Sequence, residues 1–289
     1  MPRTERFIVT RVGADGSSRR PDELIVEEPL TIQLDGVTVS TTMRTPGNDY
    51  ELAVGFCFTE GLLAGARVTG VRYCAAGPAA DTEFNVVSVD TGGLAPPPMP
   101  RLGLTSSSCG WCGSDQLDEL AARLDPLPDI EPIPLDVLRA VPDDVRETQV
   151  LFESTGSVHA AAVFDAAGNV STTREDVGRH NAVDKVIGAR HLAAPDAAPD
   201  AAPDAARDAG QDARDGPTSG LGLFVSGRAS IEMVQKAWAG GFTTVLAVSA
   251  PTTLAVRAAR RAGIMLVGFV RDDSLNVYSQ PPRRRTPVA

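Results

Sequence analysis

The second half of the sequence constrains the fold most, because short, almost wholly apolar segments alternate there with segments of helical period. The apolar segments are 221–226, 243–249 and 264–270, and the helical segments between them are 230–241 and 252–263. Strands that are apolar on both faces are typical of parallel sheets buried between helices. The sequence therefore predicts an α/β fold with a mostly parallel sheet that helices cover on both faces.

The residues just before this pattern predict further elements of the same unit. The predicted elements are helices at 114–124, 142–156 and 181–192 and strands at 158–165 and 170–175. Gly156 is the expected end of the second helix, since glycine is the usual residue after a helix C-terminus. Together with the later strands and helices, these elements predict a three-layer α/β domain over 106–289.

The first hundred residues predict a smaller α+β domain, 1–105, in which strands surround one helix. The predicted strands are 6–12, 23–29, 30–34, 37–43, 67–74 and 82–90. Asp35-Gly36 is a dipeptide typical of a two-residue hairpin turn, so it should join two of these strands. The helix is predicted over 49–63, with Asn48 or Asp49 as its cap.

Residues 193–220 interrupt the second half with repeats of Ala-Ala-Pro-Asp and contain no aromatic residue. Such a segment cannot bury enough apolar surface to offset the entropy of ordering. We therefore expect a disordered surface loop without a role in the chemistry.

The composition excludes several classes of protein. No apolar run approaches the roughly 20 residues that span a bilayer, and the first residues do not resemble a secretory signal. The net charge of −10 argues against a nucleic-acid partner, because phosphate binding usually requires a basic face. Four cysteines in 289 residues are too few for a disulfide framework. We expect a cytoplasmic protein without a membrane or nucleic-acid partner.

Two of the four cysteines, Cys109 and Cys112, form a Cys-Gly-Trp-Cys motif. A zinc site would need two further ligands, and the sequence has no second Cys-x-x-Cys motif. A redox dithiol and a sulfur carrier both fit the spacing, because a thiolate near a helix N-terminus is stabilised and reactive. Cys57 and Cys74 fall within apolar elements and are expected to be buried.

Polar side chains gather at three predicted junctions, 152–161, 173–185 and 224–233. Ligands of α/β proteins bind at the carboxyl ends of strands, and Ser226-Gly227-Arg228 before a helix suits a phosphate. Three polar junctions without a metal motif predict a large ligand with several phosphates. Arg179 and His180 are further candidates for the same crevice.

Five motifs stand out along the chain: TPGNDYELAVGFCFTEGLL, CGWCG, FESTGSVHAAAVFD, REDVGRHNAVDKVIG and SGRASIEMVQKA. In this order and combination they resemble the FdhD family, the formate dehydrogenase accessory sulfurtransferases. The resemblance covers about residues 20–280 apart from the loop at 193–220. Any one of these motifs alone would not be specific.

The resemblance implies a carrier that takes sulfur from an L-cysteine desulfurase. It implies that the sulfur goes to the bis-molybdopterin guanine dinucleotide form of the molybdenum cofactor, before that cofactor is inserted into formate dehydrogenase. Cys109 then carries the persulfide, with Cys112 as a helper or resolving thiol, and members of the family pair as homodimers. The implied cofactor-binding residues are Phe224, Val225, Ser226, Gly227, Arg228 and Ala229, to which the junction argument adds Ser230, Arg179 and His180.

The resemblance also implies that the larger domain has a cytidine deaminase-like fold, although the deaminase chemistry is not supported. A zinc deaminase has His-x-Glu and Pro-Cys-x-x-Cys motifs. His159, His180 and His191 are each followed two positions later by alanine, and Ser108 rather than proline precedes Cys109. No structural metal is expected either, because the sequence has no second Cys-x-x-Cys motif to complete a zinc site. Two other functions stay open, a dithiol–disulfide oxidoreductase and a non-enzymatic chaperone that only binds the molybdenum cofactor.

Overall fold

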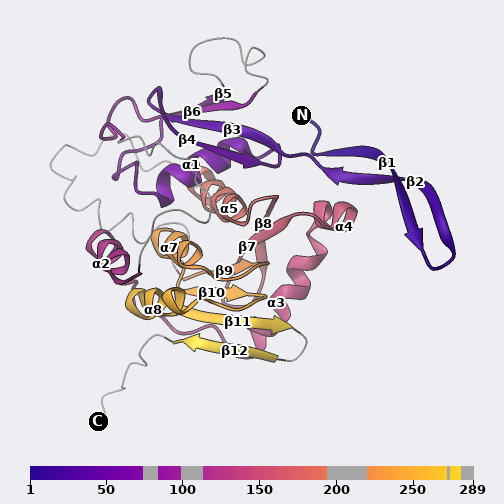
Figure 1. The fold of residues 1–289 in the computed structure, drawn as a ribbon. Helices are drawn as coiled ribbons and strands as arrows, with labels where there is room; N and C mark the ends of the chain where they lie inside the picture. Colours follow the sequence, from indigo (N-terminus) through magenta and orange to yellow (C-terminus); the bar gives the residue numbers. More distant parts are fainter. Residues whose placement is uncertain (74–83, 99–112, 194–219, 272–273, 281–289) are drawn as a thin grey trace.

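The structure, a computed structural model, describes residues 1–73, 84–98, 113–193, 220–271 and 274–280. Cys74, Cys109, Cys112 and nearly all of the predicted loop at 193–220 lie outside these ranges. The predictions for those residues stay predictions. The described residues form two sheets with their helices and one separate hairpin (Figure 1).

The larger sheet has six strands in the order β12-β11-β10-β9-β7-β8. Its strands are β7 (His159–Phe164), β8 (Val170–Asp176), β9 (Gly222–Val225), β10 (Thr244–Ala247), β11 (Met265–Arg271) and β12 (Ser274–Ser279). β9, β10 and β11 are parallel, but β7, β8 and β12 are antiparallel to their neighbours. The expectation of a mostly parallel sheet is therefore wrong, because only β9, β10 and β11 run parallel. β8 and β12 each follow the preceding strand after a few residues, and such short connections allow only antiparallel pairing.

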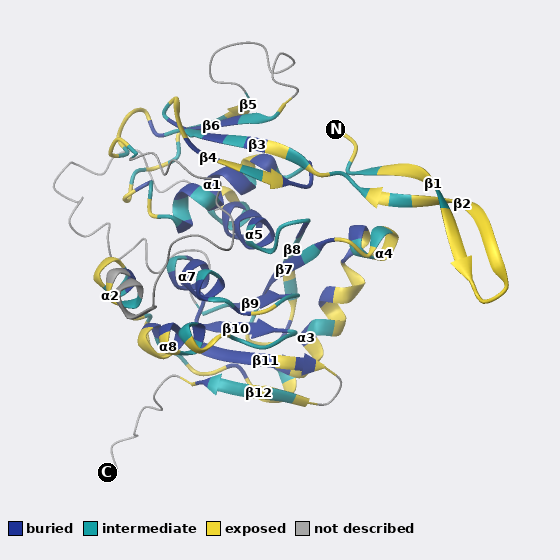
Figure 2. Ribbon diagram, in the orientation of Figure 1, coloured by how far each residue is buried: buried dark blue, intermediate teal, exposed yellow. Residues whose placement is uncertain are grey.

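Helices cover both faces of this sheet, as predicted (Figure 1). One face carries α5 (Arg179–Ala193), α7 (Ile231–Ala239) and α8 (Thr253–Ala262), with α2 (Gly113–Arg123) beside α8; the other carries α3 (Leu135–Glu147). Val163 and Leu223 point into the core under the first group of helices. Phe164, Phe224 and Leu138 pack in the core under α3. The inner strands β7, β9, β10 and β11 are mostly buried, and Figure 2 shows that β12, at one edge of the sheet, is mostly intermediate or exposed.

The predicted helix at 142–156 is two helices in the structure. They are α3 (Leu135–Glu147) and α4 (Val150–Thr155). The Glu175 carboxylate accepts hydrogen bonds from the N–H groups of Leu151 and Phe152, both at 2.8 Å, and so fixes a new helix start. The predicted end is confirmed, because Gly156 follows α4 in the left-handed region with φ 65°.

The smaller sheet has four strands in the order β4-β3-β6-β5, and α1 (Asp49–Thr59) covers one of its faces. Its strands are β3 (Glu28–Leu34), β4 (Val37–Arg44), β5 (Gly70–Tyr73) and β6 (Val86–Asp90). The predicted hairpin turn is confirmed, with φ 46° at Asp35 and 83° at Gly36. The predicted side-chain cap is wrong: Asn48 occupies the cap position without a side-chain hydrogen bond. The Asp49 carboxylate pairs with the Arg44 guanidinium instead.

A hairpin of two long strands extends away from both sheets (Figure 1). Its strands are β1 (Thr4–Gly13) and β2 (Gly16–Ile25). Most of its side chains are exposed, including the apolar Ile8 and Val12. β2 begins earlier than the predicted strand at 23–29 and includes Pro21. Proline is tolerated there because each strand of a two-stranded ribbon has one unpaired edge.

α1 and α5 join the two sheets and cross in direct backbone contact (Figure 1). A Cβ atom at Gly55 would lie 1.9 Å from the carbonyl oxygen of Asp184. A Cβ atom at Gly188 would lie 1.8 Å from the carbonyl oxygen of Glu51. No side chain fits at either position, so the two glycines permit the crossing. The crossing brings the loop between β4 and α1 to the junction between β8 and α5.

Candidate functional site

The three polar junctions meet at one edge of the six-stranded sheet. β9 ends at this edge, and the antiparallel β7 begins there, with Ala161 opposite Val225. β8 ends at the same edge, with Asp176 opposite His159. In open α/β sheets the crevice beyond the carboxyl ends of the strands is the usual ligand site. The register therefore makes this edge the candidate site.

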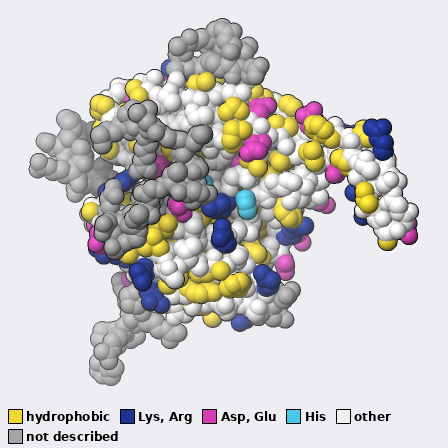
Figure 3. All heavy atoms as spheres, viewed as in Figure 1, with side chains coloured by type: hydrophobic (Ala, Val, Ile, Leu, Met, Phe, Trp, Pro, Cys, Tyr) yellow, Lys and Arg dark blue, Asp and Glu magenta, His cyan; other side chains and the backbone are white. Residues whose placement is uncertain are grey.

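Gly227 lies at this edge between a histidine and an arginine. A Cβ atom at Gly227 would lie 3.6 Å from both Nδ1 and Cε1 of His159 and 3.9 Å from Cδ of Arg179. The three residues come from β7, from α5 and from the turn between β9 and α7. Figure 3 shows that basic side chains also adjoin a histidine near the middle of the viewed face. His159 belongs to the predicted polar junction at 152–161, but the sequence does not assign it to the cofactor; the signal is a histidine at the start of a strand that follows a hydroxyl-rich turn.

Several residues of the predicted cofactor stretch position the turn rather than face the crevice. Phe224 and Val225 are buried in the cores on opposite faces of the sheet. The Ser226 Oγ accepts a hydrogen bond from the N–H of Ala160 at 2.9 Å, which holds β9 to β7. Ala229 is fully buried. Their side chains are therefore engaged within the fold.

α7 begins at the crevice with a buried hydroxyl group and an exposed arginine beside it. Ser230 occupies the N-cap position, yet its buried Oγ has no hydrogen-bond partner among the residues that the structure describes. Arg228, two residues earlier, is exposed. The first N–H groups of a helix have no acceptor within the helix and attract anions. This end of α7 is suited to a phosphate group.

Arg179 and His180, the first residues of α5, have different surroundings. Arg179 lies toward Gly227, and its buried Nε has no hydrogen-bond partner within the described ranges. Burial, together with the charges of Arg179 and Lys236, lowers the pKa of His180 to about 4. Glu232 and Glu60 oppose that shift. His180 is therefore neutral near pH 7 and lies close to charged groups of α7 and α1.

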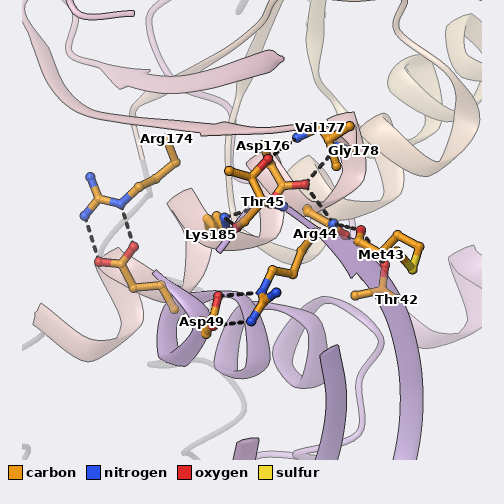
Figure 4. Close-up of polar contacts among 12 residues, drawn as sticks. Thr42, Met43, Arg44, Thr45, Asp49, Arg174, Asp176, Val177, Gly178 and Lys185 are labelled. Carbon is orange, nitrogen blue, oxygen red and sulfur yellow. Dashed lines mark hydrogen bonds and ion pairs between the residues drawn. The ribbon is translucent and has the colours of Figure 1, made fainter. Parts of the chain in front are cut away.

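The other polar residues of the β8–α5 junction hold the two sheets together (Figure 4). The Asp176 carboxylate accepts hydrogen bonds from the N–H of Thr45 at 3.1 Å and from Nζ of Lys185 at 2.7 Å. Lys185 also donates to the carbonyl oxygen of Thr45 at 2.9 Å. Arg174 forms an ion pair with Glu51 of α1. These residues stabilise the contact between the two sheets rather than face the crevice, although they are close to Arg179 and His180 in the sequence.

A second buried ion pair lies between α5 and α7. Nζ of Lys236 lies 2.9 Å from both carboxylate oxygens of Asp184 and 3.0 Å from Oγ1 of Thr59. Both charged side chains are almost completely buried. The sequence signal for this pair is a lysine among the buried apolar residues of α7, since a buried charge needs a counter-charge.

Cys57 is fully buried in α1, as predicted. Burial, with a smaller effect of the Asp184 charge, raises the pKa of its thiol to about 12, so it stays protonated and unreactive. Within the described ranges, no three His, Cys, Asp or Glu side chains gather in a way that could hold a metal ion. None of the helices there is both long and apolar enough to cross a bilayer.

Comparisons with known proteins give matches along nearly the whole chain. The sequence model of the FdhD/NarQ family matches residues 25–285. The sulfur carrier protein FdhD of Mycolicibacterium paratuberculosis is 42% identical over 288 residues, which cover 97% of this chain and 98% of that protein. The sulfur carrier protein FdhD of Streptomyces coelicolor is 43% identical over 290 residues, which cover 97% and 95%.

A solved structure matches along nearly the whole chain. It is the crystal structure of a protein from Desulfotalea psychrophila described as a formate dehydrogenase accessory protein. The match has a TM-score of 0.69 and covers 97% of this chain and 98% of that one, at 21% sequence identity. At that identity the likeness concerns the fold alone.

Proposed function

Because this chain belongs to the FdhD/NarQ family, we propose that it is a sulfur carrier required for formate dehydrogenase activity. The names of its relatives and its Cys-Gly-Trp-Cys motif support this function. The Cys109 thiolate attacks the terminal sulfur of a persulfide on an L-cysteine desulfurase. The sulfur–sulfur bond of that persulfide breaks, and the desulfurase thiolate leaves. Cys109 then holds the sulfur as its own persulfide, without net oxidation of either protein.

The acceptor substrate is the bis-molybdopterin guanine dinucleotide form of the molybdenum cofactor, before it enters formate dehydrogenase. The Cys112 thiolate attacks Sγ of Cys109, the persulfide bond breaks, and a Cys109–Cys112 disulfide forms. With one proton from solvent, the outer sulfur leaves as hydrosulfide for the molybdenum. A dithiol reductant must then reduce the disulfide before the next cycle.

The main support for a cofactor site is that the three polar junctions lie close together around Gly227. We place the guanine dinucleotide phosphates over the turn from Gly227 to Ser230, where the N-terminal N–H groups of α7 and the exposed Arg228 favour an anion. Ser230 Oγ and Arg179 Nε offer two buried groups that have no other partner in the described part of the chain. His180 is assigned an indirect role, because it lies near Lys236 of α7.

Cys109→Ala tests the sulfur transfer. After incubation with desulfurase and cysteine, the wild-type protein should gain the mass of one sulfur atom, and the variant should not. Cells that contain only the variant should make inactive formate dehydrogenase. Cys57→Ala is the matched control, because the thiol of Cys57 is buried and protonated. A Cys109→Ala variant that activates the enzyme normally would refute the assignment.

Two results would favour other functions. Catalytic cycling of the Cys109–Cys112 pair against protein disulfides, without a persulfide, would indicate an oxidoreductase. Normal activation by a variant that lacks both thiols but still binds the cofactor would indicate a chaperone.

The family resemblance supports further proposals about the whole protein. We propose a cytoplasmic homodimer, which sedimentation equilibrium of the full chain tests. We also propose that residues 106–289 form a cytidine deaminase-like domain and residues 1–105 a smaller one. The mixed six-stranded sheet between two layers of helices and the separate four-stranded sheet support this division.

A further inference from the structure

His159 is a polar residue of the crevice to which the proposed function gives no role. Nδ1 and Cε1 of its ring are both 3.6 Å from the position that a Cβ atom would take at Gly227. His159 begins β7, and the hydrogen bonds of the next residue, Ala160, to Ser226 fix the backbone there. The half-buried imidazole is therefore held against the proposed phosphate-binding turn by the sheet itself.

The charges that face His159 favour an anion in the crevice. Arg179 approaches the imidazole from α5, and Asp176 approaches it from β8. The Asp176 carboxylate is already engaged by Nζ of Lys185 and by the N–H of Thr45. Burial and the charge of Arg179 lower the pKa of His159, and Asp176 offsets them only in part. The His159 imidazole and the Arg179 guanidinium are thus held close together. Because both can carry a positive charge, a bound anion would stabilise this arrangement.

We propose that His159 contacts the phosphate held at the turn from Gly227 to Ser230 and takes up one proton as that phosphate binds. This inference rests on the proposed function, because it concerns the same ligand, a pyrophosphate diester of a guanine nucleotide. An anion beside the ring favours the imidazolium form, whose N–H then donates a charge-assisted hydrogen bond to a phosphate oxygen. The proton comes from solvent, and no bond in the ligand breaks.

Binding should strengthen as the pH falls. In the free protein, the pKa of His159 lies below its ordinary value, so the ring is neutral near pH 7. The bound phosphate raises that pKa, so the complex binds more protons than the free protein between the two values. The affinity is greatest below the free-state pKa, decreases as the pH rises through the bound-state pKa, and is constant above it. Each unit of difference between the two values changes the affinity about tenfold.

Diguanosine pyrophosphate is a suitable probe, because its pyrophosphate diester does not titrate between about pH 5 and about pH 8, where histidine does. Calorimetry of the full chain in buffers of different ionisation enthalpy measures the protons taken up per probe bound. Proton NMR of the histidine rings gives the titration midpoint of His159 with and without the probe. We expect proton uptake and a rise of the midpoint by about one pH unit or more.

His159→Gln is the informative variant, and His191→Gln is its matched control. Glutamine keeps an N–H donor but does not titrate near neutral pH. The variant should show no proton uptake on binding, and it should bind more weakly than the wild type at about pH 5.5. His191 packs on the ring of Phe58 at 5.0 Å between centroids, at the far end of α5 from Arg179. Its variant should take up protons as the wild type does.

Wild-type binding without proton uptake, or unchanged uptake by His159→Gln, would overturn this inference and leave the proposed cofactor site intact. If the variant does not fold, the NMR titration of the wild type decides, because an unmoved His159 midpoint also overturns the inference. A wild-type protein that does not bind the probe at any pH would instead overturn the cofactor site, and this inference with it.

Discussion

At the scale of single residues, the polar side chains of the β8–α5 junction have two different roles. Some are paired within the core, and others face the crevice. Asp176 and Lys185 are fully buried and bind the loop between β4 and α1. Arg179 lies between them in the sequence but points toward Gly227. Charges that are paired in the core hold the fold, and only the groups left without a partner are available to a ligand.

Lys185→Met should destabilise the protein by about 3 to 5 kcal/mol, because it leaves the Asp176 carboxylate buried without its ion-pair partner. Urea unfolding followed by circular dichroism measures the loss. Arg72→Ala is the matched control: Arg72 pairs with Asp90 at 2.7 Å, but 58% of its side chain is exposed. That variant should lose less than about 1 kcal/mol. Equal losses in the two variants would contradict a dominant effect of burial.

His180 should make the protein less stable in acid. Its pKa is about 4 in the folded protein, mainly because of burial, and about 6.5 in an unfolded chain. Between these values the unfolded chain binds more protons, so the free energy of unfolding decreases as the pH falls from about 6.5 to about 4. His180→Gln should remove this part of the decrease. The measurement is the unfolding free energy of both proteins at several pH values; identical pH dependences would contradict the prediction.

At the scale of elements, the crossing of α1 and α5 depends on two glycines within helices, where glycine is otherwise unfavourable. Replacing a helical glycine with alanine usually stabilises a helix by about 1 kcal/mol. At Gly55 and Gly188 the added Cβ would overlap the backbone of the other helix. Packing therefore outweighs helix propensity at this crossing.

Gly188→Ala should lower the thermal midpoint, because α5 must move away from the carbonyl oxygen of Glu51. The control is Ala189→Gly, one residue along and partly exposed, which should cost only about 1 kcal/mol through helix propensity. Thermal unfolding followed by circular dichroism compares the two. A Gly188→Ala protein that melts at a higher temperature than the wild type would contradict the close crossing.

The hairpin of β1 and β2 should contribute little to the stability of the rest of the molecule. Most of its side chains are exposed, and a two-stranded hairpin is marginally stable alone. Replacing residues 9–20 with Asn-Gly keeps the pairing of Ile8 with Pro21 and removes the outer part. The free energy of unfolding in urea should change by less than about 0.5 kcal/mol. A loss as large as that of Lys185→Met would show that the outer hairpin packs on the protein.

At the scale of the whole molecule, the two sheets have separate cores but are joined by the α1–α5 crossing and by hydrogen bonds from two buried ion pairs to Thr45 and Thr59. We therefore expect both sheets to unfold in one cooperative transition. Trp238 reports on the larger sheet, because it is buried in the core under α7. In a Trp111→Phe background, Trp238 fluorescence and circular dichroism should give the same urea midpoint. Separate midpoints would show that the sheets unfold independently.

Most element types can be predicted from local patterns, because periodicity and turn residues act over a few positions. The apolar strands of the larger sheet, the turn at Asp35-Gly36 and the helix end at Gly156 all follow from residues within a few positions. The same is true of the motifs that identify the family. β12 is an exception, since no strand is expected at 274–279 from the sequence pattern.

Tertiary contacts set the direction of β7 relative to β9, the break between α3 and α4, and which polar residues meet. The reason is that these features depend on contacts between residues distant in the sequence. The hydrogen bond between Thr45 and Asp176 spans 131 residues, and the one between Ala160 and Ser226 spans 66. Local patterns suggest a shared crevice but not its partners, so the meeting of His159, Arg179 and Gly227 depends on strand order, register and the start of α5 after β8.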